Sequence, residues 1–284
     1  MRAKYSALFG LIFAFLISAE VHAAACCTSA TAFGTGRLLL WEKWASGVRF
    51  QANHELGFYD DSGRFEPTEP GVVDQQLRLD AYALYPTSEN GSVFVVIPWL
   101  FARMGRNDGI TTNSNLSDVQ IGYRHQLVAI GEFEELPGIA LSGAVLLPTG
   151  TPKVTGRDAL ILISGASFEK TWMPFFAQLN LGGSLLFNQI RSRNKTPDPI
   201  TGSFQVSLAS GWEVTNELVT SIMCSWTYEM PSKWKTEGGL AASYRINPNL
   251  TAQMNVSSDL FVNGSGSNWP GNLSYGFGIR YGYF

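Results

Sequence analysis

Charged residues, histidine and cysteine are all scarce in this chain of 284 residues. Lys, Arg, Asp and Glu together make up 15% of it, against about 25% in a typical soluble domain. The formal net charge is only −3, so the chain lacks the basic surface with which proteins bind nucleic acid. This composition is not that of an ordinary soluble protein, and no nucleic-acid partner is expected.

The few histidines and cysteines leave little material for catalytic or metal chemistry. His54 and His125 stand on the apolar side of alternating segments, and neither shares a face with a Ser or Asp that could complete a nucleophile–base pair. The cysteines show no zinc-binding spacing and no disulfide framework. We therefore predict no enzyme activity, no metal and no cofactor.

Long apolar runs are also missing, except near the N-terminus. Arg2 and Lys4 precede an apolar run at 7–19, and Val-His-Ala at 21–23 has the small-residue form of a signal peptidase site. We predict that residues 1–23 are a cleaved secretory signal, with a retained anchor as the alternative.

Cys26 is a candidate for lipid attachment. The stretch Ala23-Ala24-Ala25-Cys26 resembles a lipoprotein processing site, but Ala23 stands where such sites usually have Leu. Plain cleavage near Ala23 is therefore the favoured alternative. Residues 24–43 are expected to plug a lumen or to lie at its periplasmic mouth.

What the chain has in abundance is alternation of apolar and polar residues with period two, the pattern of β-strands that face two environments. In 72–85, for example, Leu77 and Leu79 share one face, whereas Arg78 and Asp80 share the other. About twelve such segments follow one another, at 44–59, 72–86, 91–104, 116–128, 138–149, 158–170, 173–190, 199–212, 216–230, 237–246, 249–262 and 271–284.

The connections after odd-numbered segments are mostly long and polar, as in GRNDGITTNSN (105–115) and PSKWKTEGG (231–239), whereas those after even-numbered segments are mostly short. This asymmetry is typical of outer-membrane barrels, with long external loops and short periplasmic turns. We predict an all-β fold for 44–284: a transmembrane up-and-down antiparallel β-barrel of about 12 strands. A secreted β-sandwich is the alternative, disfavoured by the long strands and the sparse charges.

The polar phase of the alternation carries charges that a barrel would turn into its lumen, where they set which solutes pass. A pair of these carboxylates could instead do acid–base work, but acids mixed with arginines favour a structural or selectivity-setting network. The candidates are Arg49, Glu55, Asp74, Arg78, Asp80, Asp118, Arg124, Asp259 and Arg280.

One region resembles a known family. Ser117-Asp118 and Tyr123-Arg124 are followed by Leu147-Pro148-Thr149-Gly150, and this pattern is similar to the Gram-negative outer-membrane barrels of the meta-pathway phenol-degradation-like or "transporter" family. The resemblance covers about forty residues and implies a channel, with hydrophobic or aromatic small molecules as solutes. Because Pro148 cannot donate to a sheet, the last motif also has a structural interpretation as a strand end.

The C-terminal segment LSYGFGIRYGYF reads as the closing strand of the barrel, paired with the first near Val48 and Phe50. We expect Tyr281, Tyr283 and Phe284 to carry the signal for the barrel assembly machinery, although Phe284 lies out of phase with the apolar face. The predicted protein is a passive channel for small solutes in lipid of the bacterial outer membrane. A structural or surface-adhesive barrel is the alternative, and a lipid-modifying enzyme is less favoured.

Overall fold

The computed structural model describes residues 43–60, 64–69, 72–106, 109–128, 135–150, 159–172, 174–189, 202–215, 217–229, 233–263 and 269–283. The strands are β1 (Trp44–Tyr59), β2 (Phe65–Pro67), β3 (Val73–Ser88), β4 (Gly91–Arg106), β5 (Gly109–Leu116), β6 (Val119–Val128), β7 (Gly138–Leu147), β8 (Ala159–Trp172), β9 (Phe175–Gln189), β10 (Gly202–Glu213), β11 (Leu218–Glu229), β12 (Lys233–Asn247), β13 (Leu250–Asn263) and β14 (Trp269–Tyr283). In the part of the chain that is described, no helix is long and apolar enough to cross a membrane.

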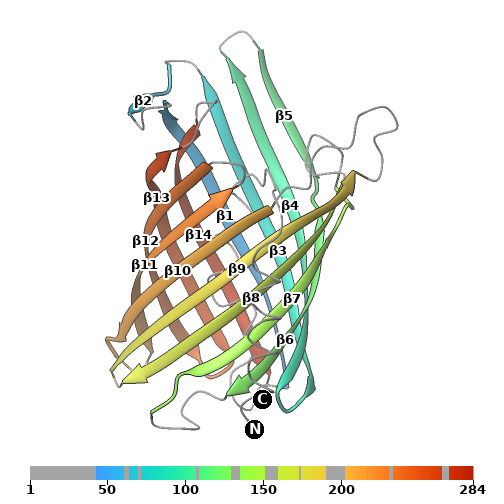
Figure 1. The fold of residues 1–284 in the computed structure, drawn as a ribbon, viewed down its shortest axis with the longest axis vertical. Coiled ribbons are helices and arrows are strands. Elements are labelled where there is room, and N and C mark those ends of the chain that lie inside the picture. The colour runs from blue at the N-terminus through green and yellow to red at the C-terminus, as the bar shows by residue number, and fades with distance from the viewer. Residues whose placement is uncertain are drawn as a thin grey trace, which may run out of the picture.

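Twelve of these strands close into one antiparallel barrel (Figure 1). Neighbours in the barrel follow chain order, and β1 pairs on one side with β3 and on the other with β14. The expected pairing of the last strand is confirmed, since Val48 lies opposite Ile279 and Phe50 opposite Phe277. Within the described part of the chain, closure leaves no free edge between the twelve strands of this wall, as a structure surrounded by lipid requires.

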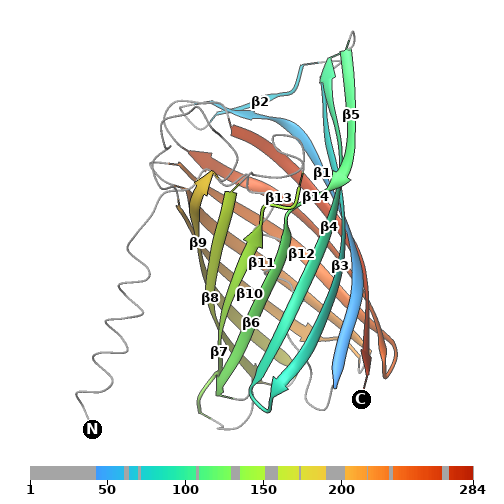
Figure 2. The same cartoon turned by 90° about the vertical axis from the view of Figure 1, so that its right-hand side faces the viewer.

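The remaining two strands, β2 and β5, extend the barrel at its upper end. β2 pairs with the last residues of β1, and β5 pairs with the upper half of β4, so that the β4–β5 hairpin rises above the wall (Figure 2). The lower end holds the start of β1, the end of β14 and the tight turns at Glu89-Asn90 and Pro248-Asn249.

All twelve predicted strands are found, but three predicted loops contain further strand residues, the first of them β2 in the connection after 44–59. Most of 105–115 forms the top of β4 and all but the last residue of β5, and β12 begins at Lys233 rather than at 237. The physical reason is that β5 stands above the wall and so need not have an apolar face. Its Thr, Ser and Asn residues show none of the alternation that marks a strand against lipid.

The barrel wall is apolar on its outer face and polar on its inner face, the reverse of a soluble protein. Apolar side chains on the outer face are exposed, such as Ile222 at 56% and Met254 at 57% of their area, whereas polar ones on the inner face are buried, such as Gln51 at 6% and Asp80 at 1%. Large apolar surface exposed on all sides marks contact with lipid. The strand alternation predicted from the sequence therefore separates lipid from lumen.

Aromatic rings on the inner face lie over glycines of the neighbouring strand. Tyr82 covers Gly47 and Phe94 covers Gly122, and a methyl group at either glycine would overlap the ring. Packing of this kind lays a bulky side chain along the wall instead of across the lumen. Tyr82 and Phe94 belong to an apolar cluster with Leu84, near the lower end of the lumen.

Candidate functional site

The candidate site is the lumen, where two ion clusters occupy different heights. In the lower half, Arg49 on β1 and Arg78 on β3 both bind the carboxylate of Asp80. Arg49 Nη2 lies 2.5 Å from Oδ2, and Arg78 Nε lies 2.6 Å from Oδ1. Register explains the contact, because Arg49 pairs with Asp80 across the two strands. Two cations share one anion in this arginine cluster (Arg49, Arg78, Asp80).

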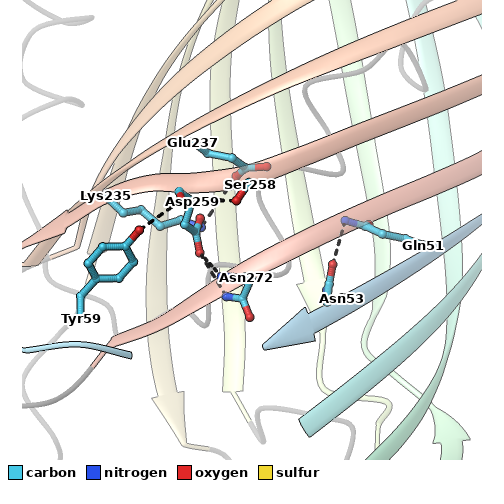
Figure 3. A network of polar contacts seen from close by, with 8 residues as sticks. All are labelled: Gln51, Asn53, Tyr59, Lys235, Glu237, Ser258, Asp259 and Asn272. Atoms are coloured by element: carbon cyan, nitrogen blue, oxygen red, sulfur yellow. Dashed lines mark hydrogen bonds and ion pairs between the residues drawn. The ribbon is translucent and has the colours of Figure 1, made fainter. Parts of the chain in front are cut away.

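The second ion cluster lies near the upper end, on β12 and β13 (Figure 3). Lys235 Nζ lies 3.0 Å from Asp259 Oδ1 and 3.7 Å from Glu237 Oε2, and all three side chains are buried. The backbone N–H of Asn272 on β14 donates to Asp259 Oδ2 at 3.0 Å, and the Tyr59 hydroxyl donates to the Asp259 carbonyl at 3.3 Å. This lysine cluster (Lys235, Glu237, Asp259) has two anions for one cation, so one negative charge is in excess.

Glu55 and Asp74 are neighbouring carboxylates on the upper part of β1 and β3, one residue beyond the paired His54 and Gln75. The wall from β12 round to β3 therefore carries mostly carboxylates near the upper end. Lower on the same wall it carries mostly guanidinium groups, including Arg280, which is 7% exposed. The charged part of the lumen is thus polarised along the barrel axis.

Asp118 and Arg124, also predicted to face the lumen, lie apart from both clusters. Arg124 Nη2 on β6 donates to Ser167 Oγ on β8 at 3.3 Å. Asp118 stands in the break between β5 and β6, where its Oδ1 accepts a hydrogen bond from Gly150 N at 2.9 Å. Its contact is with the backbone of the segment after β7.

The same break explains why the two quoted motifs occur together. Thr149 Oγ1 accepts a hydrogen bond from Val119 N at 2.9 Å and donates to the Ser117 carbonyl at 3.0 Å. With the bond from Gly150 to Asp118, Thr149 ties the end of β7 to the β5–β6 break. The Ser-Asp and Leu-Pro-Thr-Gly motifs therefore form one joint in the wall, in line with the structural interpretation of Pro148.

A cavity of about 200 Å³ opens in the lower half of the lumen. Arg49 and Gln51 line it on β1, and Phe176 and Gln178 line it on β9. These two strands are six positions apart around the barrel in both directions, so they form opposite walls. The described lining further includes Ala209, Val219, Ser221, Met223, Ala241, Ser243, Gln253, Asn255, Ser257 and Gly278.

Solved structures of outer-membrane barrels are similar to this chain over most of its length. A COG4313 outer-membrane channel from Pseudomonas putida F1 matches with a TM-score of 0.71 at 12% identity, covering 88% of this chain and 98% of the channel. The autotransporter NalP translocator domain from Neisseria meningitidis has a TM-score of 0.54 at 11% identity, with coverages of 89% and 92%. The KdgM porin in complex with oligogalacturonate has a TM-score of 0.51 at 8% identity, with coverages of 84% and 99%.

The chain has the fold of the outer-membrane β-barrels. No family model and no curated protein sequence matches it, so its similarity to known proteins is a similarity of fold. The predicted fold class is confirmed, and the similar structures are outer-membrane proteins, in agreement with the predicted location.

The lower end of the barrel carries aromatic side chains of the kind found in belts at membrane interfaces. Trp44 stacks on Tyr283 with ring centroids 5.9 Å apart and lies 5.8 Å from Tyr281. Lys43 Nζ lies 5.5 Å from the centre of the Tyr283 ring. These contacts join the first and last strands of the outer-membrane barrel, whereas Phe284 and Cys26 lie outside the described residues, as do the predicted signal peptide and nearly all of the segment 24–43.

Sequence reasoning missed Lys235, Glu237 and Gln51 as lumen residues of this barrel. Lys235 lies in a stretch that the sequence analysis interpreted as a loop. The alternation of Trp234, Lys235, Thr236 and Glu237 is a signal that β12 begins before residue 237. Gln51 was passed over because it is uncharged. Its amide oxygen is nevertheless buried without a hydrogen-bond partner among the described residues.

Proposed function

We propose that the barrel is a passive channel for small solutes across the bacterial outer membrane. The observation that carries the proposal is the inner wall, where buried charged and amide side chains surround a cavity. A lumen built only for stability could be filled with apolar side chains at lower cost, since buried charge is a poor source of stability. Charged lumen residues instead select what passes.

The similar structures support the same class of function. The Pseudomonas putida protein is described as an outer-membrane channel and KdgM as a porin. The family resemblance adds hydrophobic or aromatic compounds as solutes, and the apolar side of the cavity, with Phe176 and Met223, suits such a compound. Membrane lipid and the barrel assembly machinery are the other partners that the proposal requires.

Single-channel recording of the purified protein in a planar bilayer tests this function. We expect stable conductance steps in KCl, because a polar lumen holds water and ions. A protein that migrates as a folded barrel on unheated gels but never conducts would contradict the channel and favour the structural or surface-adhesive alternative.

The segment 24–43 is proposed to plug the lumen or to lie at its periplasmic mouth. Deleting residues 24–42 downstream of the signal should raise the conductance of each step at least twofold if the segment narrows the pathway. Deletion of the same residues should leave conductance unchanged if the segment lies aside from the pathway. Unheated gels serve as the folding control for the shortened chain.

A further inference from the structure

We propose that the lumenal cavity binds a neutral, polyhydroxylated solute of the chemical class of the sugars. This inference rests on the proposed channel function and names its solute class. The hydroxyl groups of the solute would face amide and hydroxyl side chains on β11, β12 and β13. The apolar face of its ring would lie along the side of the cavity that holds Phe176.

Uncharged hydrogen-bonding side chains from three adjacent strands line one side of the cavity. We call them the polar patch: Ser221 of β11, Ser243 of β12, and Gln253 and Asn255 of β13. Ser243 and Gln253 lie directly opposite each other across β12 and β13. Ser221 and Asn255 both pair with Ala241 of β12, one on each side of it. The four side chains therefore belong to one continuous surface.

The polar patch is available to a solute. In the described part of the chain, its four side chains make no hydrogen bond to another residue, and all four are partly exposed. Hydroxyl and carboxamide groups both donate and accept hydrogen bonds. Solute hydroxyl groups also do both, so they can take the place of water on every member of the patch.

The cavity is nearly free of charged side chains. Arg49 is the one charged residue among the described lining, and it is bound to Asp80. The polar positions beside it and on the opposite wall, Gln51 on β1 and Gln178 on β9, are carboxamides. An ionic solute would therefore lose its hydration mostly against uncharged groups, which is unfavourable for a charge. A neutral solute avoids this cost.

The remaining side of the cavity is apolar. Phe176 on β9 lies over Gly211 of β10, and its ring is therefore held along the wall. Val219 and Met223 on β11 continue this surface. Binding sites for small molecules commonly combine such a surface with a few placed polar groups. A sugar ring suits both, because its hydroxyl groups point outward from a ring whose faces carry C–H groups, whereas a pure hydrocarbon would leave the polar patch unused.

The wall next to the polar patch leaves room for a ring. Gly278 of β14 stands between Gln253 of β13 and Arg49 of β1, and a Cβ atom placed on it would come no nearer than 3.3 Å to its neighbours. The cavity volume of about 200 Å³ is many times the roughly 15 Å³ that one water needs. Because the lining runs from β1 round to β9 on the opposite wall, a bound solute should obstruct the ion current.

The test compares three six-membered rings as blockers of single-channel current: methyl glucoside, which is neutral and polyhydroxylated, glucuronate, its anionic relative, and cyclohexanol, which keeps one hydroxyl group. We expect the half-blocking concentration of methyl glucoside to be at least fivefold below those of the other two. Gln253→Met removes one amide of the polar patch at nearly constant length. It should raise the methyl glucoside value at least fivefold and leave the cyclohexanol value unchanged.

The matched control is Gln120→Met on β6. Gln120 is a buried glutamine of the inner wall that does not line the cavity, so the same exchange there should change neither value. A second variant of the patch, Asn255→Leu, should also raise the methyl glucoside value and leave that of cyclohexanol unchanged. Unheated gels verify that each variant is folded. If Gln253→Met does not fold, Asn255→Leu and the three solutes on the native chain still decide.

The outcomes separate this proposal from the channel function. Conductance steps that methyl glucoside blocks no better than glucuronate or cyclohexanol would overturn the sugar site and leave the channel standing. If no steps occur, the channel fails, and calorimetric titration with the same three solutes tests the site alone, on protein in a detergent without a sugar headgroup. Equal or undetectable heats would overturn it, and a preference for methyl glucoside that Gln253→Met weakens would support it.

Discussion

The arginine cluster and the lysine cluster are built alike but have opposite charge composition. Each places three charged side chains on adjacent strands of the inner wall. In the first, one carboxylate is shared by two guanidinium groups, and in the second, one ammonium group is shared by two carboxylates. In the arginine cluster two guanidinium groups share one carboxylate, and Arg49 lines the cavity. The lysine cluster keeps a negative excess near the external end, and its Asp259 is further held by the backbone of β14.

This difference separates a functional from a structural use of buried charge. The lysine cluster binds three strands together through Asp259 and Asn272, whereas the arginine cluster joins two strands and faces the cavity. An external zone rich in carboxylates and a deeper zone rich in arginines would together produce a field along the pathway. Three sets of substitutions test this comparison.

The largest effect is expected from removing a shared anion. Asp80→Asn leaves two buried arginines side by side without their carboxylate, which should destabilise the barrel by about 3 kcal/mol. Asp259→Asn should cost less, because Lys235 keeps Glu237 as a partner. The measurement is the temperature at which the folded band is lost on sodium dodecyl sulfate gels. An equal decrease in this temperature for both variants would contradict the distinction between the clusters.

An intermediate effect is expected on ion selectivity. Arg78→Gln removes lumenal positive charge and should shift the reversal potential in a KCl gradient toward cations, and Arg124→Gln should act in the same direction. Glu237→Gln should shift it toward anions. The physical reason is that lumen charges attract counterions in a confined, poorly screened space. Unchanged reversal potentials for both arginine variants would count against their lumenal assignment.

The smallest effect concerns the uncharged joint between β7 and the β5–β6 break. Thr149→Val loses the hydrogen bonds to Val119 and Ser117, at a cost of about 1 kcal/mol. Thr111→Val on exposed β5 serves as the control. Urea unfolding of the barrel in lipid bilayers measures both, and a joint variant as stable as the control would show that this contact does not hold the wall.

Alternation in the sequence correctly predicted the twelve strands of the barrel wall and which of their side chains share a face. The direction of a side chain in a strand depends only on local backbone geometry, so a period of two suffices to place Arg49, Arg78 and Asp80 on the polar face. It does not say which of them meet, because that depends on the register between β1 and β3. Asp118 shows the same limit, since Gly150, which donates a hydrogen bond to it, follows 32 residues later, after β6 and β7.

The sequence by itself determined the architecture: long alternating strands, few charges and a regular order of connections permit little other than a closed barrel in lipid. Only the tertiary structure decided what the lumen contains. Strand register placed one aspartate between two arginines, and barrel closure set Arg49 opposite Phe176. Hydropathy is a local property, whereas contacts across a lumen depend on the tilt, stagger and number of all the strands between them.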